Sequence, residues 1–177
     1  MSRCPSVPAT FSMFSLRTSR QDSVVACVST HDLPTFAGWW NGADIAERRA
    51  LRMVDYDAAE RAIDERRHEK EELATAMRAE GLPTVASLDA SGPHVAPVMR
   101  DVHRFVGATP AMLVLLQADD LAAETVAQNL PGTDRERPNW RRKAGVIASD
   151  LWHTDIGLAA AADFAPARGR KDDDGVL

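Results

Sequence analysis

The chain has 177 residues, a formal net charge of −5, 45% hydrophobic residues and 27% charged residues. A chain of this length forms one domain, or one domain with a small appendage, and buries roughly 70% of the surface of its unfolded form. The longest apolar run, 111–116, is too short to span a bilayer, and the acidic balance disfavours nucleic-acid binding. We therefore expect no membrane and no nucleic acid among its partners.

Residues 1–21 differ in composition from the rest of the chain, with five serines, two prolines, three arginines and no acidic residue. This composition is typical of an organellar transit peptide, but it also fits a misplaced start or a frame error upstream of the folded protein. The segment lacks the apolar core of a secretory signal, and Cys4 and Cys27 form no CxxC motif or disulfide framework. We expect a disordered segment here and a reducing cytoplasm as the compartment.

The first predicted element is a strand over 23–29, which ends before Pro34 and is rich in β-branched residues, as is typical of a strand buried on both faces. A helix is predicted over 44–53, and 57–60 has the pattern of a capping box that opens a longer helix. That helix ends before Gly81, and its mixed charge run, 64–72, predicts a solvated face. The residues expected on its buried face are Ala59, Ile63, Leu73 and Met77.

The second half of the chain contains a second buried strand candidate, 111–116, placed between helices. Two strands separated by helices imply parallel pairing through a helical crossover, yet two strands alone leave both edges of the sheet uncovered. The other predicted elements are a loop over 84–93, a helix over 95–106, a short helix over 121–127, a loop over 129–140, an alanine-rich helix over 151–165 and a charged tail over 166–177.

Several familiar sites are absent from the sequence. His68 and Glu69 begin like a zinc-protease motif, but Glu72 stands where the second histidine is needed, and His94 and His103 have no accompanying cysteine cluster. The sequence contains no glycine-rich phosphate loop and no GxSxG nucleophile elbow. We therefore expect no metal and no cofactor.

The pair His31-Asp32 comes after the first strand, where parallel α/β folds place their catalytic side chains. The carboxylate of Asp32 is suited to stabilising positive charge, and His31 to donating a hydrogen bond to a hydroxyl. The alternative is that the pair only satisfies backbone donors at the strand end. Trp39 and Trp40 likewise suit either a sugar-stacking platform or the core.

Three further blocks of sequence occur in a fixed order along the chain. They are VSTHDLPT running into GWW (28–35 and 38–40), QADDL (117–121), and NLPGT followed by PNWRRK (129–133 and 138–143). Taken together, these blocks resemble the C-terminal part of the 4-α-glucanotransferases, also called amylomaltases or disproportionating enzymes (glycoside hydrolase family 77). The resemblance covers 22–165, which corresponds to roughly the last quarter of a family member.

The resemblance implies the seventh and eighth strands, with their helices, of a (β/α)8 TIM barrel. Family members transfer a segment of an α-1,4-glucan to the 4-hydroxyl of an acceptor sugar such as glucose or maltose, with retention. By resemblance, Asp32 is a transition-state stabiliser and His31 binds substrate hydroxyls. The loop that carries Asn129, Gly132 and Thr133 lines the acceptor side.

The nucleophile and the acid/base of the family lie on its fourth and fifth strands, and 1–21 matches nothing in the family. We therefore expect a truncated or frame-shifted product that is inactive alone, although Asp119 and Asp120 are placed where a makeshift partner for Asp32 could lie. Two alternatives remain. One is a non-catalytic carbohydrate-binding or interaction fragment, and the other is an unrelated α/β protein in which His31-Asp32 is a cap.

Overall fold

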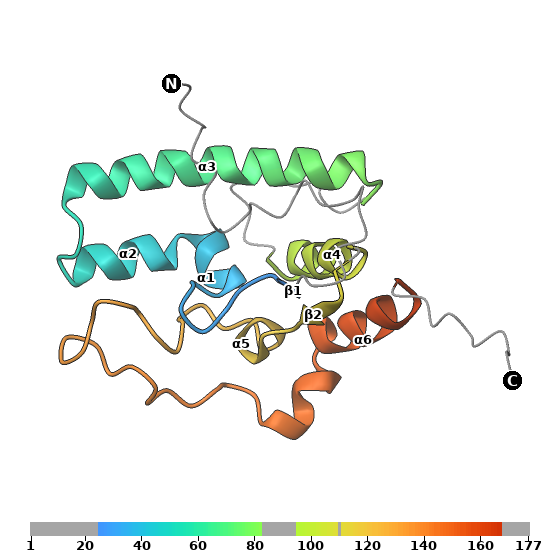
Figure 1. Cartoon of the computed structure of the whole chain (residues 1–177). Coiled ribbons are helices and arrows are strands. Elements are labelled where there is room, and N and C mark those ends of the chain that lie inside the picture. Colours follow the sequence, from blue (N-terminus) through green and yellow to red (C-terminus); the bar gives the residue numbers. More distant parts are fainter. Residues whose placement is uncertain (1–24, 83–94, 110, 168–177) are drawn as a thin grey trace, which may run out of the picture.

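Two parallel strands lie at the centre of the structure, with the longest helix above them and a long irregular segment below (Figure 1). The computed structural model describes residues 25–82, 95–109 and 111–167. The predicted segments 1–21 and 84–93 lie outside the described residues, as does all but the start of the tail. The elements are β1 (Val25–Cys27), α1 (Phe36–Asn41), α2 (Ala43–Ala50), α3 (Tyr56–Ala79), α4 (Val95–Gly107), β2 (Leu113–Leu115), α5 (Ala118–Leu121), a 3-10 helix η2 (Ala148–His153) and α6 (Asp155–Ala167).

The predicted parallel pairing is confirmed, with Val25 opposite Leu113 and Cys27 opposite Leu115. Both strands are shorter than predicted, and the expectation that each is buried on both faces is wrong. Ala26 is fully buried, but Val25, Leu113 and Leu115 are 47%, 49% and 55% exposed. Because side chains in register on parallel strands point to the same side, these residues form one exposed apolar face of the sheet.

Helix α1 was not predicted, and it explains the paired tryptophans. Its N-terminal residue is capped by Thr35, whose Oγ1 accepts a hydrogen bond from the Gly38 N–H at 3.1 Å. Trp39 and Trp40 are each 4% exposed and pack with residues of α3 and α4 in the hydrophobic core. The interpretation of this pair as a sugar-stacking platform is therefore wrong, and the interpretation as core is confirmed. The helix predicted over 44–53 is α2.

The long helix α3 is confirmed, but its cap lies two residues before the predicted one. Asp55 Oδ1 accepts a hydrogen bond from the Ala58 N–H at 2.7 Å, so Asp55 and not Asp57 is the N-cap. The predicted buried face holds for Ala59, Leu73 and Met77. Ile63 is 43% exposed instead, since it borders a hollow of about 260 Å³ that separates this part of α3 from Trp40 and Ile45.

The charge run of α3 is only partly the solvated face that was predicted. Arg66 makes a bidentate ion pair with Asp44 of α2, at 3.0 and 2.9 Å, and lies 4.6 Å from the ring centre of Trp39. Lys70 lies 4.7 Å from the ring centre of Trp40. Burial, and then the charge of Arg66, lower the pKa of Lys70. These two cations thus help to fasten α3 to α1 and α2.

Helix α4 is confirmed and contributes Val98, Met99, Val102 and Phe105 to the core, where α6 packs against it. The helix predicted over 121–127 is wrong. The short helix α5 ends at Leu121, and the chain then turns through a positive φ of 53° at Ala123.

The helix predicted over 151–165 is confirmed as α6, although it begins later than predicted. The hydroxyl of Thr154 accepts a hydrogen bond from the Gly157 N–H at 3.0 Å at the start of α6, and the residues before Thr154 form η2. In the described part of the chain, no helix is both long enough and apolar enough to cross a membrane.

The exposed sheet face predicts concentration-dependent self-association. Replacing Leu115 by Thr keeps a strand-forming residue but removes apolar surface, so Leu115→Thr should lower the self-association measured by sedimentation velocity over a concentration series. Ile147→Thr is the control, because Ile147 is 72% exposed but lies outside the sheet. Equal effects of the two substitutions, or no association of the unaltered chain, would contradict the prediction.

Buried His103 predicts a loss of stability in acid. Burial lowers the pKa of this histidine below its ordinary 6.5, against the opposing effects of the Met99 carbonyl and of Asp120. The unfolded chain then binds the proton more readily than the folded chain. Stability that is present above about pH 6.5 is therefore lost as the pH falls toward the lowered pKa of His103 in the folded chain. The unfolding free energy of the unaltered chain relative to His103→Gln should decrease on acidification in urea titrations. An unfolding free energy that depends on pH in the same way in the unaltered chain and in His103→Gln would contradict the prediction.

Candidate functional site

The segment that carries His31 and Asp32 is held at both ends by one buried carboxylate. After β1, the Ser29 hydroxyl donates a hydrogen bond to Asp120 Oδ2 at 2.5 Å. At the start of α1, the Phe36 N–H donates to Asp120 Oδ1 at 2.7 Å. Between these points the chain turns, with the Leu33 N–H bonded to the Thr30 carbonyl. Asp120 thus fixes the span of the loop that presents His31 and Asp32.

Asp120 has no exposed surface, and burial raises the pKa of its carboxyl group. The hydrogen bonds from Ser29 and Phe36, and then the charge of His103, act in the opposite direction. Its neighbour Asp119 accepts a hydrogen bond from Gln128 Nε2 at 3.2 Å. Both oxygens of Asp120 thus accept hydrogen bonds from the loop ends, whereas the hydrogen bond that Asp32 accepts comes from Asn129.

His31 and Asp32 project from this loop into solvent, with side chains 56% and 52% exposed. His31 Nε2 lies 3.2 Å from Asp32 Oδ2, and Asn129 Nδ2 donates a hydrogen bond to Asp32 Oδ1 at 2.7 Å. The ring of His31 lies 5.4 Å from that of Trp140, which is 62% exposed. The structure thus brings together three of the site residues expected from sequence, although Asn129 is 97 residues from Asp32.

The other two expected residues lie on the turn after Asn129. The Thr133 hydroxyl donates to the Leu130 carbonyl at 2.6 Å and accepts from Asn139 Nδ2 at 2.9 Å. Gly132 adopts a φ of +85°, the left-handed region that favours glycine. Thr133 therefore shapes the turn with hydrogen bonds inside the loop, and these bonds reach neither His31 nor Asp32.

A hollow of about 620 Å³ adjoins this group. Asn129, Thr133, Asn139 and Trp140 all line it, so residues that touch Asp32 and His31 also form its wall. Amide, hydroxyl and indole groups at an open surface are suited to binding a polyhydroxylated ligand. Within the described ranges, no three histidine, cysteine or acidic side chains are grouped closely enough to hold a metal ion.

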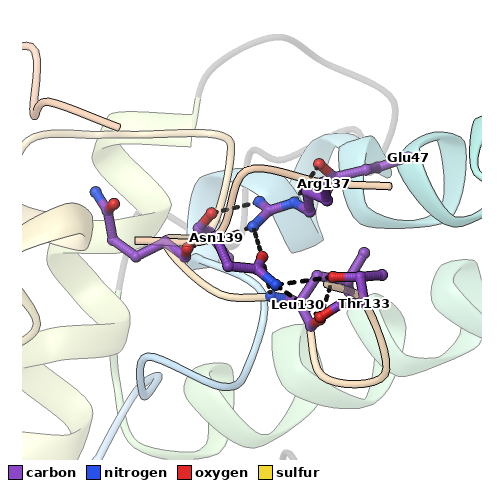
Figure 2. Close-up of polar contacts among 7 residues, drawn as sticks. Glu47, Leu130, Thr133, Arg137 and Asn139 are labelled. Atoms are coloured by element: carbon purple, nitrogen blue, oxygen red, sulfur yellow. Dashed lines mark hydrogen bonds and ion pairs between the residues drawn. The ribbon is translucent and has the colours of Figure 1, made fainter. Parts of the chain in front are cut away.

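Sequence reasoning missed Arg137, which lies beneath the same loop. It is only 7% exposed, and Figure 2 shows its guanidinium group between Glu47 of α2 and Asn139 of the loop. An arginine between a glutamate and a proline in a polar segment looks like a surface residue, and no sequence signal distinguishes it from Arg141 or Arg142. Arg142 pairs instead with Glu124, at 2.8 Å.

The role of Asp120 predicts that its removal is costly. Asp120→Ala leaves the Ser29 hydroxyl and the Phe36 N–H buried without an acceptor, and should lower the unfolding free energy by about 3 kcal/mol. Asp120→Asn retains an acceptor oxygen and should cost less. Chemical denaturation measures both values. Asp150→Ala, which removes an exposed carboxylate from η2, is the control and should change stability by less than about 0.5 kcal/mol. A loss in Asp120→Ala no larger than in this control would contradict the assignment.

Comparison with known proteins identifies similar sequences and a similar structure. The proteins named 4-alpha-glucanotransferase from Mycobacterium tuberculosis and Mycobacterium bovis are each 29% identical over 117 residues, which is 66% of this chain and 16% of theirs. The one from Haemophilus influenzae is 25% identical over 120 residues, 67% of this chain and 17% of its own. The amylomaltase from Corynebacterium glutamicum superimposes with a TM-score of 0.70 at 25% identity, covering 82% of this chain and 22% of that protein.

The chain thus spans about a sixth of the length of these curated relatives. The family model described as 4-alpha-glucanotransferase, glycoside hydrolase 77, matches residues 8–147. The match begins inside 1–21, the segment that we expected to match nothing in the family. Since it includes most of the chain, together with every residue of the site described above, this chain belongs to the 4-alpha-glucanotransferase family.

Proposed function

We propose that this chain supplies the His-Asp part of the active site of a 4-α-glucanotransferase, which transfers a segment of an α-1,4-glucan to the 4-hydroxyl of an acceptor sugar with retention. The observation that carries the proposal is the grouping of His31, Asp32 and Asn129 in solvent at the end of β1. Catalytic side chains in parallel α/β folds occur at this end of the strand.

Asp32 is proposed as the transition-state stabiliser. Cleavage of a glycosidic bond with retention develops positive charge on the sugar ring, and a fixed carboxylate beside that ring stabilises it. The hydrogen bond from Asn129 fixes Asp32 Oδ1, and His31 lies against Oδ2. Because these partners hold the carboxylate before substrate arrives, little reorganisation is needed when the charge develops.

The other site residues are proposed to bind sugar hydroxyls. We propose that the ring of His31 binds a hydroxyl of the reacting sugar and that Asn129, Gly132 and Thr133 line the acceptor side. Asn129 has a further amide hydrogen and a carbonyl oxygen besides the hydrogen bond that it donates to Asp32. The substrates are then maltodextrins and similar α-1,4-glucans, with glucose or maltose as acceptors.

The fold proposed for the complete enzyme is a (β/α)8 barrel in which β1 and β2 are the seventh and eighth strands. The parallel register and the exposed apolar face of these strands support this, since the inner face of a barrel is covered by side chains of the other strands. We propose that the nucleophile and the acid/base are provided from outside these 177 residues, that the chain assayed alone is inactive, and that the complete enzyme acts in the cytoplasm.

The proposed catalytic role is tested in a chimera in which residues 25–167 replace the matching part of the C. glutamicum amylomaltase. In an active chimera, Asp32→Asn removes the charge but keeps an acceptor for Asn129. It should lower kcat on maltotriose on the order of 100-fold, with a smaller change in KM. His31→Ala should cost less, because its hydroxyl contact exists before and during the reaction.

His68→Ala is the control, because His68 is exposed on α3 and pairs with Glu72 of the same helix, away from the site. It should leave kcat unchanged. The chain alone should produce no maltodextrin ladder from maltotriose. Near-full transfer by the Asp32→Asn chimera would contradict the catalytic role. Sugar binding without any effect of Asp32→Asn on kcat would favour the alternative of a non-catalytic carbohydrate-binding fragment.

A further inference from the structure

We propose that Arg137 is the positioning residue of this site. Its buried guanidinium group clamps the two ends of the sugar-binding loop, 129–140, to each other and to α2. It thereby places Asn129 and Trp140 beside Asp32 and His31. The sugar-binding part of this statement rests on the proposed function, whereas the clamp itself rests on the contacts of Arg137.

Every nitrogen of the Arg137 guanidinium group has a partner. Nε donates to Glu47 Oε1 at 2.8 Å, and Nη1 donates to Asn139 Oδ1 at 2.7 Å and to the Gln128 carbonyl at 3.3 Å (Figure 2). Nη2 donates to the Ala127 carbonyl. Arg137 is 7% exposed, and a buried guanidinium group is stable only when acceptors satisfy its N–H donors. The acceptors named above meet this requirement.

Two of the acceptors of Arg137 also accept the hydrogen bonds that join the two ends of the loop. The Gln128 carbonyl also accepts the Trp140 N–H at 2.9 Å, and Asn139 Oδ1 also accepts the Leu130 N–H at 3.1 Å. Arg137 therefore binds the oxygen atoms through which one end of the loop is joined to the other. Loss of the guanidinium group should therefore weaken both of these hydrogen bonds.

The two loop ends carry the contacts to the His-Asp pair. Asn129 comes directly after Gln128 and bonds to Asp32, and Trp140 comes directly after Asn139 and lies beside His31. Trp140 has a positive φ of 60°, an unfavourable conformation for a residue with a side chain, so the surrounding ties must hold it there.

The clamp also has a fixed base. Glu47 lies on α2, and the same helix is joined to α3 by the pair of Asp44 with Arg66. Arg137 does not line the hollow of about 620 Å³, and its hydrogen bonds go to residues other than His31 and Asp32. It acts through Asn129, Asn139 and Trp140, which is why it is a positioning residue and not a catalytic one.

Hydrogen–deuterium exchange of the 177-residue chain, at concentrations low enough to limit association, tests the clamp. Arg137→Met keeps an unbranched side chain but removes all the donors. Exchange of the loop amides that include Leu130 and Trp140 should become faster by about tenfold or more, while α3 and α4 keep their protection. Arg142→Met is the matched control, because it removes an arginine of the same segment that pairs with Glu124 instead.

Arg137→Lys keeps the charge near Glu47 without the planar fork, and should restore part of the loop protection but not all of it. If Arg137→Met unfolds the whole chain, the same exchange measurement on Glu47→Gln tests the clamp instead. It keeps an acceptor for Nε, and its faster exchange should be confined to the loop. Unchanged loop exchange in Arg137→Met, or equal loosening of loop and core in Glu47→Gln, would overturn the proposal.

A titration with maltotriose, monitored by tryptophan fluorescence, separates the clamp from the sugar-binding role. The concentration that half-saturates the signal should rise about tenfold in Arg137→Met and remain unchanged in Arg142→Met. Absence of any response in the unaltered chain would count against sugar binding by this loop on its own, and the exchange measurements would still decide the clamp. Faster loop exchange in Arg137→Met with unchanged maltotriose binding would overturn the positioning role.

Discussion

The carboxylate of Asp120 is the contact on which the geometry of the site depends. It accepts hydrogen bonds from Ser29 and from the Phe36 N–H, and so joins the end of β1, the start of α1 and the segment after β2. A buried carboxylate is costly unless its oxygens are satisfied, and here the satisfaction comes from both ends of one loop. The chain between these two fixed points turns outward, so that the side chains of His31 and Asp32 are exposed.

A second buried charge acts from the opposite side. Arg137 fixes the loop that reaches Asp32 through Asn129, as Asp120 fixes the loop that carries Asp32 itself. Asp120 accepts two hydrogen bonds and Arg137 donates to several acceptors, so removing either side chain disturbs several contacts at once. Two polar segments that lie 97 residues apart in sequence are thereby held in hydrogen-bond contact in space.

The elements governed by local patterns could be predicted from the sequence. The helices α3 and α4 show a helical period, and the parallel pairing of β1 with β2 is implied by two apolar runs separated by helices. Helix α1 was missed because its residues are nearly all buried, so it has no polar face to reveal a period. Of the site, His31, Asp32 and Asn129 were chosen by position and resemblance, whereas the burial of Arg137 depends on Glu47, 90 residues away.

The sheet face and the site are separable parts of this molecule. The hydrogen bonds that shape the site run among residues 29–47 and 119–140, and none of them uses the exposed side chains of Val25, Leu113 or Leu115. Covering that face changes the environment of the strands without replacing a partner of Asp120 or Arg137. The arrangement of His31, Asp32 and Asn129 is therefore a property of the local polar network, and it does not depend on what covers the sheet.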